Sequence, residues 1–256
     1  MELMNSRIFG LASSASFLPA PPALTAPIDH EPGEGEEVLY LAAGCFWGVD
    51  KAFWNAPGVV ATATGYMGGH IENPSYEQVC TSTTGHAETV RVVYSTAQTS
   101  AAQLIARFFE IHDPTQVDRQ GNDLGPQYRG AIWTSTPEQL DVALRARAAY
   151  QGALEAKGFG AIATQVAPAD EAGPFWYAEE YHQKYLHKNP NGYECHARTG
   201  VPCPIVWARG RGRGREKAQE RGRGPTGRSD PAPSCSIRRL RPRPEGRALR
   251  RRRGCR

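Results

Sequence analysis

Cys45 is the residue whose chemical setting stands out, within the segment Gly44-Cys45-Phe46-Trp47-Gly48. An apolar run at 38–43 predicts a buried strand, and helical spacing of apolar residues over 46–54 predicts a helix, so Cys45 falls at or near a helix N-terminus. Unsatisfied backbone N–H groups there favour a thiolate and lower the pKa of a thiol. We therefore expect Cys45 to be a nucleophile, with the two aromatic residues after it walling an apolar slot. The competing interpretation is a small buried hydrophobe.

The elements that must hold Cys45 follow from hydrophobic periodicity and capping signals. Predicted strands are 38–43, 59–65, 88–94, 129–133 and 162–167, and predicted helices are 46–54, 99–112, 137–158 and 177–187. Two polar loops, 66–86 and 113–128, are long enough to carry function. The order predicts an α+β fold: a ferredoxin-like βαβ-βαβ sandwich of a mixed sheet packed against helices, with long loops and a coiled C-terminal segment.

Charged residues are distributed unevenly along the 256-residue chain. Residues 207–256 hold 18 of the 30 Lys and Arg but 4 of the 26 Asp and Glu, which gives +14 there and −10 for residues 1–206. A basic nucleic-acid-binding main body is therefore not expected. We expect a disordered leader at 1–35, a catalytic domain at 36–206 and a disordered Arg/Gly/Pro-rich tail at 207–256. The leader could instead be a secretory signal, and whether it is cleaved stays open.

The tail leaves two interpretations open. Arg-rich segments bind RNA or DNA phosphates non-specifically, whereas a monotonous Arg, Gly and Pro composition also arises from an extended or shifted reading frame without a selected function. No window approaches the roughly 18 consecutive apolar residues of a spanning helix, so no membrane partner is expected. Six unevenly spaced cysteines predict no disulfide framework, which favours a reducing, cytoplasmic compartment. Cys195, His196 and Cys203, taken with His182 or His187, lack the paired spacing of a zinc site, so no metal is expected.

Seven motifs occur in an order and spacing that resemble the peptide methionine sulfoxide reductase A family over roughly residues 37–204. They are Gly44-Cys45-Phe46-Trp47-Gly48, Gly65-Tyr66-Met67-Gly68-Gly69, Tyr76-Glu77-Gln78-Val79-Cys80, Thr84-Gly85-His86-Ala87-Glu88, His112-Asp113-Pro114-Thr115-Gln116, Arg119-Gln120-Gly121-Asn122-Asp123 and Gln127-Tyr128-Arg129. Reduction of a sulfoxide requires a nucleophile, a proton donor for the oxygen and an apolar seat for the S-methyl group.

The resemblance implies a role for each matching residue. Cys45 attacks the sulfur, and Glu88 protonates or hydrogen-bonds the oxygen, which requires a carboxyl kept protonated by apolar surroundings. The other implied roles are oxygen binding by Tyr76 and Tyr128, methyl binding by Phe46 and Trp47, and support of the site by Asp123. Taken singly, Glu88 would be a surface charge, the tyrosines half-buried loop residues and Asp123 a turn residue.

A second thiol must then reduce the sulfenic acid left on Cys45. The resemblance implies Cys195 as the resolving cysteine and Cys203 as the recycling one, in an order the sequence leaves open. The chain departs from the commonest pattern, since Glu194 precedes Cys195 and Ala197-Arg198 replace glycines. Either thiol could be a spare surface group. Cys80 is expected to pack structurally, and Cys235 and Cys255 have no evident partner.

The resemblance implies a monomeric reductase of methionine S-sulfoxide in proteins and in the free amino acid. It would work through a cysteine sulfenic acid and an intramolecular disulfide, be recycled by thioredoxin (dithiothreitol in vitro), and bind no cofactor. Preferred protein substrates stay open. One competing hypothesis is a general thiol peroxidase acting at Cys45. Another is an RNA-binding protein that works through the tail.

Overall fold

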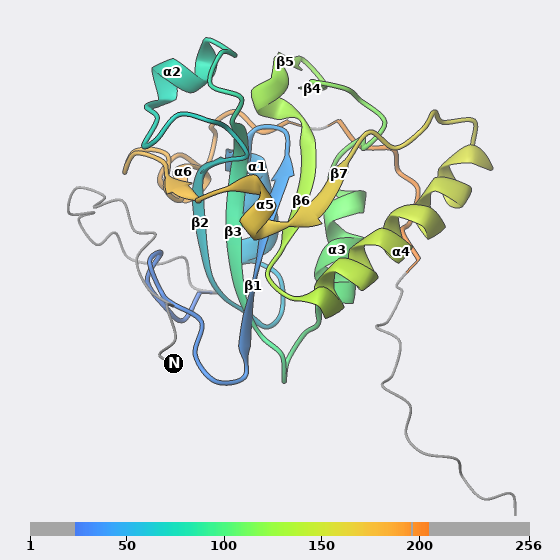
Figure 1. Ribbon diagram of the computed structural model, residues 1–256, viewed down its shortest axis with the longest axis horizontal. Coiled ribbons are helices and arrows are strands. Elements are labelled where there is room, and N and C mark those ends of the chain that lie inside the picture. The colour runs from blue at the N-terminus through green and yellow to red at the C-terminus, as the bar shows by residue number, and fades with distance from the viewer. Residues whose placement is uncertain (1–23, 196, 205–256) are drawn as a thin grey trace, which may run out of the picture. The chain divides into compact units, whose positions relative to one another are not determined.

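A six-stranded sheet with strand order β7-β6-β1-β3-β2-β8 forms the centre of the computed structural model, which describes residues 24–195 and 197–204 (Figure 1). The strands are β1 (Glu36–Ala43), β2 (Val59–Met67), β3 (Ala87–Ser95), β6 (Gly130–Thr134), β7 (Gln165–Pro168) and β8 (Trp176–Tyr177), with a separate ribbon of β4 (Arg119–Gln120) and β5 (Asp123–Leu124). In the inner order β6-β1-β3-β2 every neighbour is antiparallel. With its crossover helices this is the split βαβ arrangement, so the predicted ferredoxin-like α+β fold is confirmed.

Three of the six described α-helices begin after a residue whose side chain caps them. The six helices are α1 (Phe46–Trp54), α2 (Tyr76–Cys80), α3 (Ala101–Glu110), α4 (Pro137–Glu155), α5 (Ala169–Ala172) and α6 (Tyr185–Lys188), with a 3-10 turn η1 at Pro126–Tyr128. Ser100 and Thr136 accept the backbone N–H groups of the third residues of α3 and α4, and Pro137 opens α4. A side-chain acceptor at the N-cap satisfies one of the four N–H groups that a helix start leaves unpaired.

The sheet separates two apolar layers because strand side chains alternate between faces. On β1, Leu39 and Leu41 belong to the main core with α1, α3 and α4, whereas Ala42 packs on the opposite face. The segment with α5 covers that second face (Figure 1), and Phe175 packs against it. Both faces of β1 are thus buried, which holds its carboxyl end in place.

Residues 177–184 are not the helix that their aromatic spacing predicts, since the helix there spans only α6. Lys184 takes a left-handed conformation, with φ of 53°. Its ammonium group is buried and lies 2.7 Å from Asp50 Oδ1 and 2.7 Å from the Thr62 carbonyl oxygen. A buried charge must be paired, and this tertiary contact overrides the helical pattern. The last predicted strand also begins later, at Gln165 instead of Ile162.

The described part of the expected leader lies against the domain. Leu24 is buried in the main core, and the N–H groups of Thr25 and Ala26 donate to the Val60 oxygen. Residues 1–23 and the predicted tail at 207–256 lie outside the described residues. Within the part of the chain that the structure describes, no helix is long and apolar enough to cross a membrane.

Four strands end or begin at the same edge of the sheet, where the carboxyl ends of β1 and β2 lie beside the amino ends of β3 and β6. The antiparallel register places Ala43, the last residue of β1, opposite Gly130, the first of β6, and Tyr66 near the end of β2 opposite Glu88 near the start of β3. Side chains just beyond these ends therefore meet at one place, although they are far apart in the sequence.

Candidate active site

A cavity of about 200 Å³ opens at this edge of the sheet. Its lining side chains are Cys45, Phe46, Trp47, Tyr76, Glu88, Asp123, Tyr128 and Tyr193. The structure thus brings together seven of the nine residues singled out in the sequence and adds Tyr193. Cys195 and Cys203 do not line the cavity.

Cys45 is the N-cap residue of α1, directly after the turn at Gly44. Gly44 has a φ of 90°, which L side chains rarely adopt, and a Cβ there would lie 2.7 Å from the side chain of Gln120. Glycine is therefore required twice at this position, for its backbone conformation and for the close approach. The turn fixes the nucleophile at the cavity wall, with 8% of Cys45 exposed.

The Cys45 thiol differs from the expected thiolate. Burial raises its pKa, and Glu88 raises it further when its carboxyl is ionised, whereas the backbone N–H groups of Trp47 and Gly48 lower it. The helix terminus acts in the expected direction, but the loss of water around the sulfur outweighs it. The predicted lowering of the pKa is therefore wrong, and the resting cysteine keeps its proton.

Glu88 is a buried carboxyl, not a surface charge. It is 2% exposed, and the Phe46 N–H donates to its Oε2 at 2.9 Å. Burial raises its pKa to about 8, because the cost of removing water from the carboxylate exceeds the gain from the Phe46 hydrogen bond. At neutral pH the group holds a proton that it can donate into the cavity.

Two phenols face the same space as neutral donors. Burial raises the pKa of Tyr76 and of Tyr128, so both keep their O–H groups. Asp123 accepts the Tyr193 hydroxyl at 3.0 Å with each of its carboxylate oxygens. The cavity therefore combines hydroxyl donors with one protonated acid.

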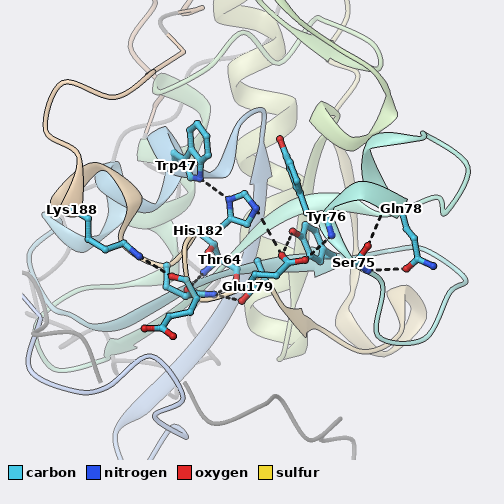
Figure 2. A network of polar contacts seen from close by, with 12 residues as sticks. Trp47, Thr64, Ser75, Tyr76, Gln78, Glu179, His182 and Lys188 are labelled. Carbon is cyan, nitrogen blue, oxygen red and sulfur yellow. Dashed lines mark hydrogen bonds and ion pairs between the residues drawn. The ribbon is translucent and has the colours of Figure 1, made fainter. Parts of the chain in front are cut away.

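Trp47 is held by a ring stack and by a hydrogen bond. It stacks on Tyr185 with ring centroids 3.7 Å apart. Its indole N–H donates to His182 Nδ1 at 3.0 Å (Figure 2). Burial lowers the pKa of His182 to about 4, so the ring is neutral. Since Nδ1 accepts from Trp47, the proton lies on Nε2, which faces Glu179 Oε2 at 3.9 Å.

Glu179 completes this arrangement by holding Tyr76 (Figure 2). Its Oε1 accepts the Tyr76 backbone N–H at 2.8 Å, and its Oε2 accepts the Tyr66 hydroxyl at 2.8 Å. Sequence reasoning missed Glu179, His182 and Tyr193. The available signal is the dense mixture of acidic, aromatic and histidine residues at 179–185, whose spacing instead predicts a helix.

The two expected resolving cysteines lie in different places. Cys195 is half-buried, and its thiol donates to the Gln120 carbonyl oxygen with an S···O distance of 3.6 Å. Cys203 is buried, and its N–H donates to Glu110 Oε1 at 2.8 Å. Burial raises the pKa of the Cys203 thiol to about 12. Both are free thiols.

Cys80 does not pack into the core as expected, because it ends α2 on the surface and is exposed. Among the described residues no group of three His, Cys, Asp or Glu side chains is arranged to hold a metal ion. His196, considered with Cys195 and Cys203, lies outside them.

Comparison with known proteins gives one consistent result. The sequence model of the family described as peptide methionine sulfoxide reductase matches residues 37–203. A peptide methionine sulfoxide reductase MsrA of Rhodospirillum centenum is 54% identical over 171 residues, covering 67% of this chain and 77% of that protein. An MsrA of Vibrio parahaemolyticus is 50% identical over 182 residues, covering 71% and 82%.

Solved structures agree with the sequence comparison. Methionine sulfoxide reductase A of Corynebacterium diphtheriae has a TM-score of 0.62 and 45% identity, covering 68% of this chain and 84% of that one. Mxr1 from Saccharomyces cerevisiae in reduced form has a TM-score of 0.60 and 32% identity, covering 66% and 94%.

Proposed function

Because the chain belongs to the peptide methionine sulfoxide reductase family, we propose that it reduces methionine S-sulfoxide to methionine, in proteins and as the free amino acid, at the Cys45 cavity. One observation carries the proposal. A thiol and a carboxyl that keeps its proton up to a pH of about 8 line one cavity whose walls include aromatic rings. A nucleophile for sulfur and an acid for oxygen are the two groups that this reduction needs.

The first step transfers the oxygen. Glu88 donates its proton to the sulfoxide oxygen while the Cys45 sulfur attacks the substrate sulfur, and the Glu88 carboxylate takes up the thiol proton. The oxygen passes to Cys45 as a sulfenic acid, and methionine leaves. The substrate sulfur gains two electrons and Cys45 loses two, so the step needs no other reagent. The Tyr76 and Tyr128 hydroxyls would stabilise the oxygen as its charge develops.

Recognition rests on shape as much as on hydrogen bonding. The rings of Phe46 and Trp47 would seat the S-methyl group, and the polar groups would hold the oxygen. A sulfoxide sulfur is pyramidal, so fixing its oxygen, its methyl group and the direction of its chain leaves only one hand accessible to Cys45. The family resemblance assigns that hand to the S-epimer, with one enzyme serving each epimer.

The second stage restores the thiol. Cys195 would attack the sulfenic acid to form a Cys45–Cys195 disulfide and water, and Cys203 would take over that disulfide for reduction by thioredoxin or, in vitro, dithiothreitol. Asp123, through Tyr193, would support the segment that carries Cys195. We further propose that the protein acts as a cytoplasmic monomer without a bound cofactor.

The experiment is to incubate the full chain with each methionine sulfoxide epimer and excess dithiothreitol, and to measure methionine. The parent should consume the S-epimer and leave the R-epimer, and Cys45→Ser should abolish turnover. Cys255→Ser, in the tail at 207–256, is the matched control and should retain it. Turnover by Cys45→Ser would reject the proposal.

The thiol peroxidase hypothesis predicts a different ranking of rates. Peroxide reacts with thiolates, and the raised pKa of Cys45 favours the thiol. We expect hydrogen peroxide to oxidise Cys45 more slowly than the S-sulfoxide does at equal concentration.

A further inference from the structure

Gln120 is a buried residue outside the cavity whose side-chain amide is fixed from both ends. The Asp113 N–H donates to its Oε1 at 3.0 Å, and its Nε2 donates to the Asp113 carbonyl oxygen at 3.0 Å. Gln120 is 1% exposed. This reciprocal pair of hydrogen bonds ties β4 to the start of the loop that follows α3.

The same side chain contacts the turn that carries the nucleophile. Its Cβ and Cγ occupy the space that a side chain on Gly44 would need, 2.7 Å from the ideal Cβ position. Gly44 immediately precedes Cys45. The position of Gln120 is therefore defined relative to the nucleophile as well as to Asp113.

The backbone of Gln120 contacts the other reacting sulfur. Its carbonyl oxygen accepts the Cys195 thiol, and a Cβ on the next residue, Gly121, would lie 3.3 Å from Cys195 Sγ. The Gly121 N–H donates to Gln116 Oε1 at 2.8 Å, so the peptide that accepts the thiol is held on both sides. Two contacts of one residue thus connect the turn at Cys45 with the Cys195 thiol.

The β4–β5 ribbon holds the resolving segment at a second point. Asp123, which pairs with Gln120 across the ribbon, accepts the hydroxyl of Tyr193, two residues before Cys195. Tyr193 also lines the Cys45 cavity. The ribbon therefore binds the segment 193–195 once through Asp123 and once through Gln120.

We propose that Gln120 is a positioning residue for the resolving step, in which it docks the Cys195 thiol beside the Cys45 turn. The inference rests on the proposed function. In that step a sulfur–sulfur bond forms between Cys45 and Cys195, the S–O bond of the Cys45 sulfenic acid breaks, and the thiol proton leaves with the hydroxyl group as water. No external reductant is consumed.

The expected effect is specific to one step. A misplacement of about 1 Å can cost on the order of 100-fold in the rate of a reaction between bound groups. Loss of the amide pair should therefore slow disulfide formation by about 10- to 100-fold. Methionine formation should stay within about twofold, because Gln120 does not line the cavity.

The test is a single turnover of the reduced full chain with one equivalent of S-sulfoxide and no reductant. Methionine is measured by chromatography, disulfide by loss of alkylatable thiols, and sulfenic acid by a dimedone adduct on Cys45. Gln120→Ala removes the whole contact, and Gln120→Met keeps bulk against Gly44 while removing both amide hydrogen bonds. Gln151→Ala is the matched control, since Gln151 bonds the 160–162 loop with both amide atoms, on α4 and away from the cavity.

In both Gln120 variants methionine should appear at the parental rate, disulfide should lag and the dimedone adduct should accumulate. Excess dithiothreitol, which reduces the sulfenic acid directly, should restore turnover, an effect that general destabilisation would not give. A parental disulfide rate in Gln120→Met, equal slowing of methionine formation, or equal slowing by Gln151→Ala overturns the inference. Absence of methionine from the parent would instead overturn the proposed function.

Discussion

The Cys45 cavity and the segment that follows Tyr193 are held in place by different kinds of contact. The cavity grows out of the ends of paired strands, and Cys45 and Glu88 are almost entirely buried. The described residues of 193–204 form neither helix nor strand. Polar contacts attach most of them, and Val201 and Cys203 also pack in the main core. The polar contacts are those of Tyr193 with Asp123, Glu194 with Lys51, Cys195 with Gln120, Thr199 and Val201 with Tyr150, and Cys203 with Glu110.

This difference separates binding from recycling. A site built on paired strands cannot shift without disturbing the core, so it is organised before the substrate arrives. Contacts in the segment are each worth on the order of 1 kcal/mol, because a hydrogen bond replaces one to water and an exposed ion pair is screened. The polar contacts of 193–199 can therefore break one at a time. In the proposed cycle this would let Cys195 move while the cavity stays fixed, whereas Cys203 would also have to leave the main core.

The largest expected effect comes from the cavity side. Glu88→Gln keeps an acceptor for the Phe46 N–H but cannot protonate the sulfoxide oxygen, so methionine formation should fall by about 10²- to 10⁴-fold in single-turnover measurements. Glu110→Gln is the matched control, since Glu110 also accepts a backbone N–H but lies outside the cavity. An unchanged rate of methionine formation in Glu88→Gln would mean that Glu88 is not the proton donor.

The pH dependence of stability tests the same carboxyl without substrate. Glu88 keeps its proton up to about pH 8 in the folded chain but loses it near 4.5 when unfolded, so the folded state binds more protons between these values. The stability it confers is complete below about 4.5 and is lost as the pH rises to about 8, on the order of 5 kcal/mol at 1.36 kcal/mol per pH unit.

Glu88→Gln should remove this slope. Urea unfolding at several pH values between 5 and 8 should show the variant gaining stability relative to the parent as the pH rises. Subtracting the parent's free energy of unfolding from that of Glu88→Gln cancels the contribution of the buried histidines, because they titrate in both proteins. Parallel curves would mean that Glu88 is ionised in the folded protein.

The smallest effect is expected in the segment. Tyr150→Phe removes the hydroxyl that contacts Thr199 Oγ1 at 2.7 Å and the Val201 oxygen at 2.8 Å. The free energy of unfolding should fall by about 1–2 kcal/mol, and the rate of Cys203 alkylation should rise a few-fold. The exposed Cys80 provides an internal reference whose rate should not change. A stability loss without faster Cys203 alkylation would mean that the segment does not detach there.

The sequence predicted the parts of the molecule that depend on local pattern. The apolar run of β1 and the caps of α3 (Thr99 or Ser100) and α4 are readable from neighbouring residues, and so is the place of Cys45 between strand and helix. Contacts that depend on burial were not readable. The predicted thiolate failed because the sequence shows a helix terminus but not the removal of water around the sulfur.

Long-range contacts explain the other differences. The predicted 177–187 helix fails because Lys184 reaches Asp50, 134 residues earlier. Similarly, His182 contacts Trp47, and Gln120 contacts Gly44 and Cys195, across separations that no local pattern encodes. The residues that support the site are therefore harder to predict than those that line it.

The proton retained on Cys45 bears on survival under oxidative stress. An enzyme that reduces methionine sulfoxide is exposed to the same oxidants that damage its substrate proteins. Oxidants attack a cysteine in proportion to its thiolate character and exposure. A nucleophile that rests in its unreactive form and sits inside an aromatic enclosure is shielded from over-oxidation between turnovers. The burial that makes the group a poor anion thus preserves it for the next damaged methionine.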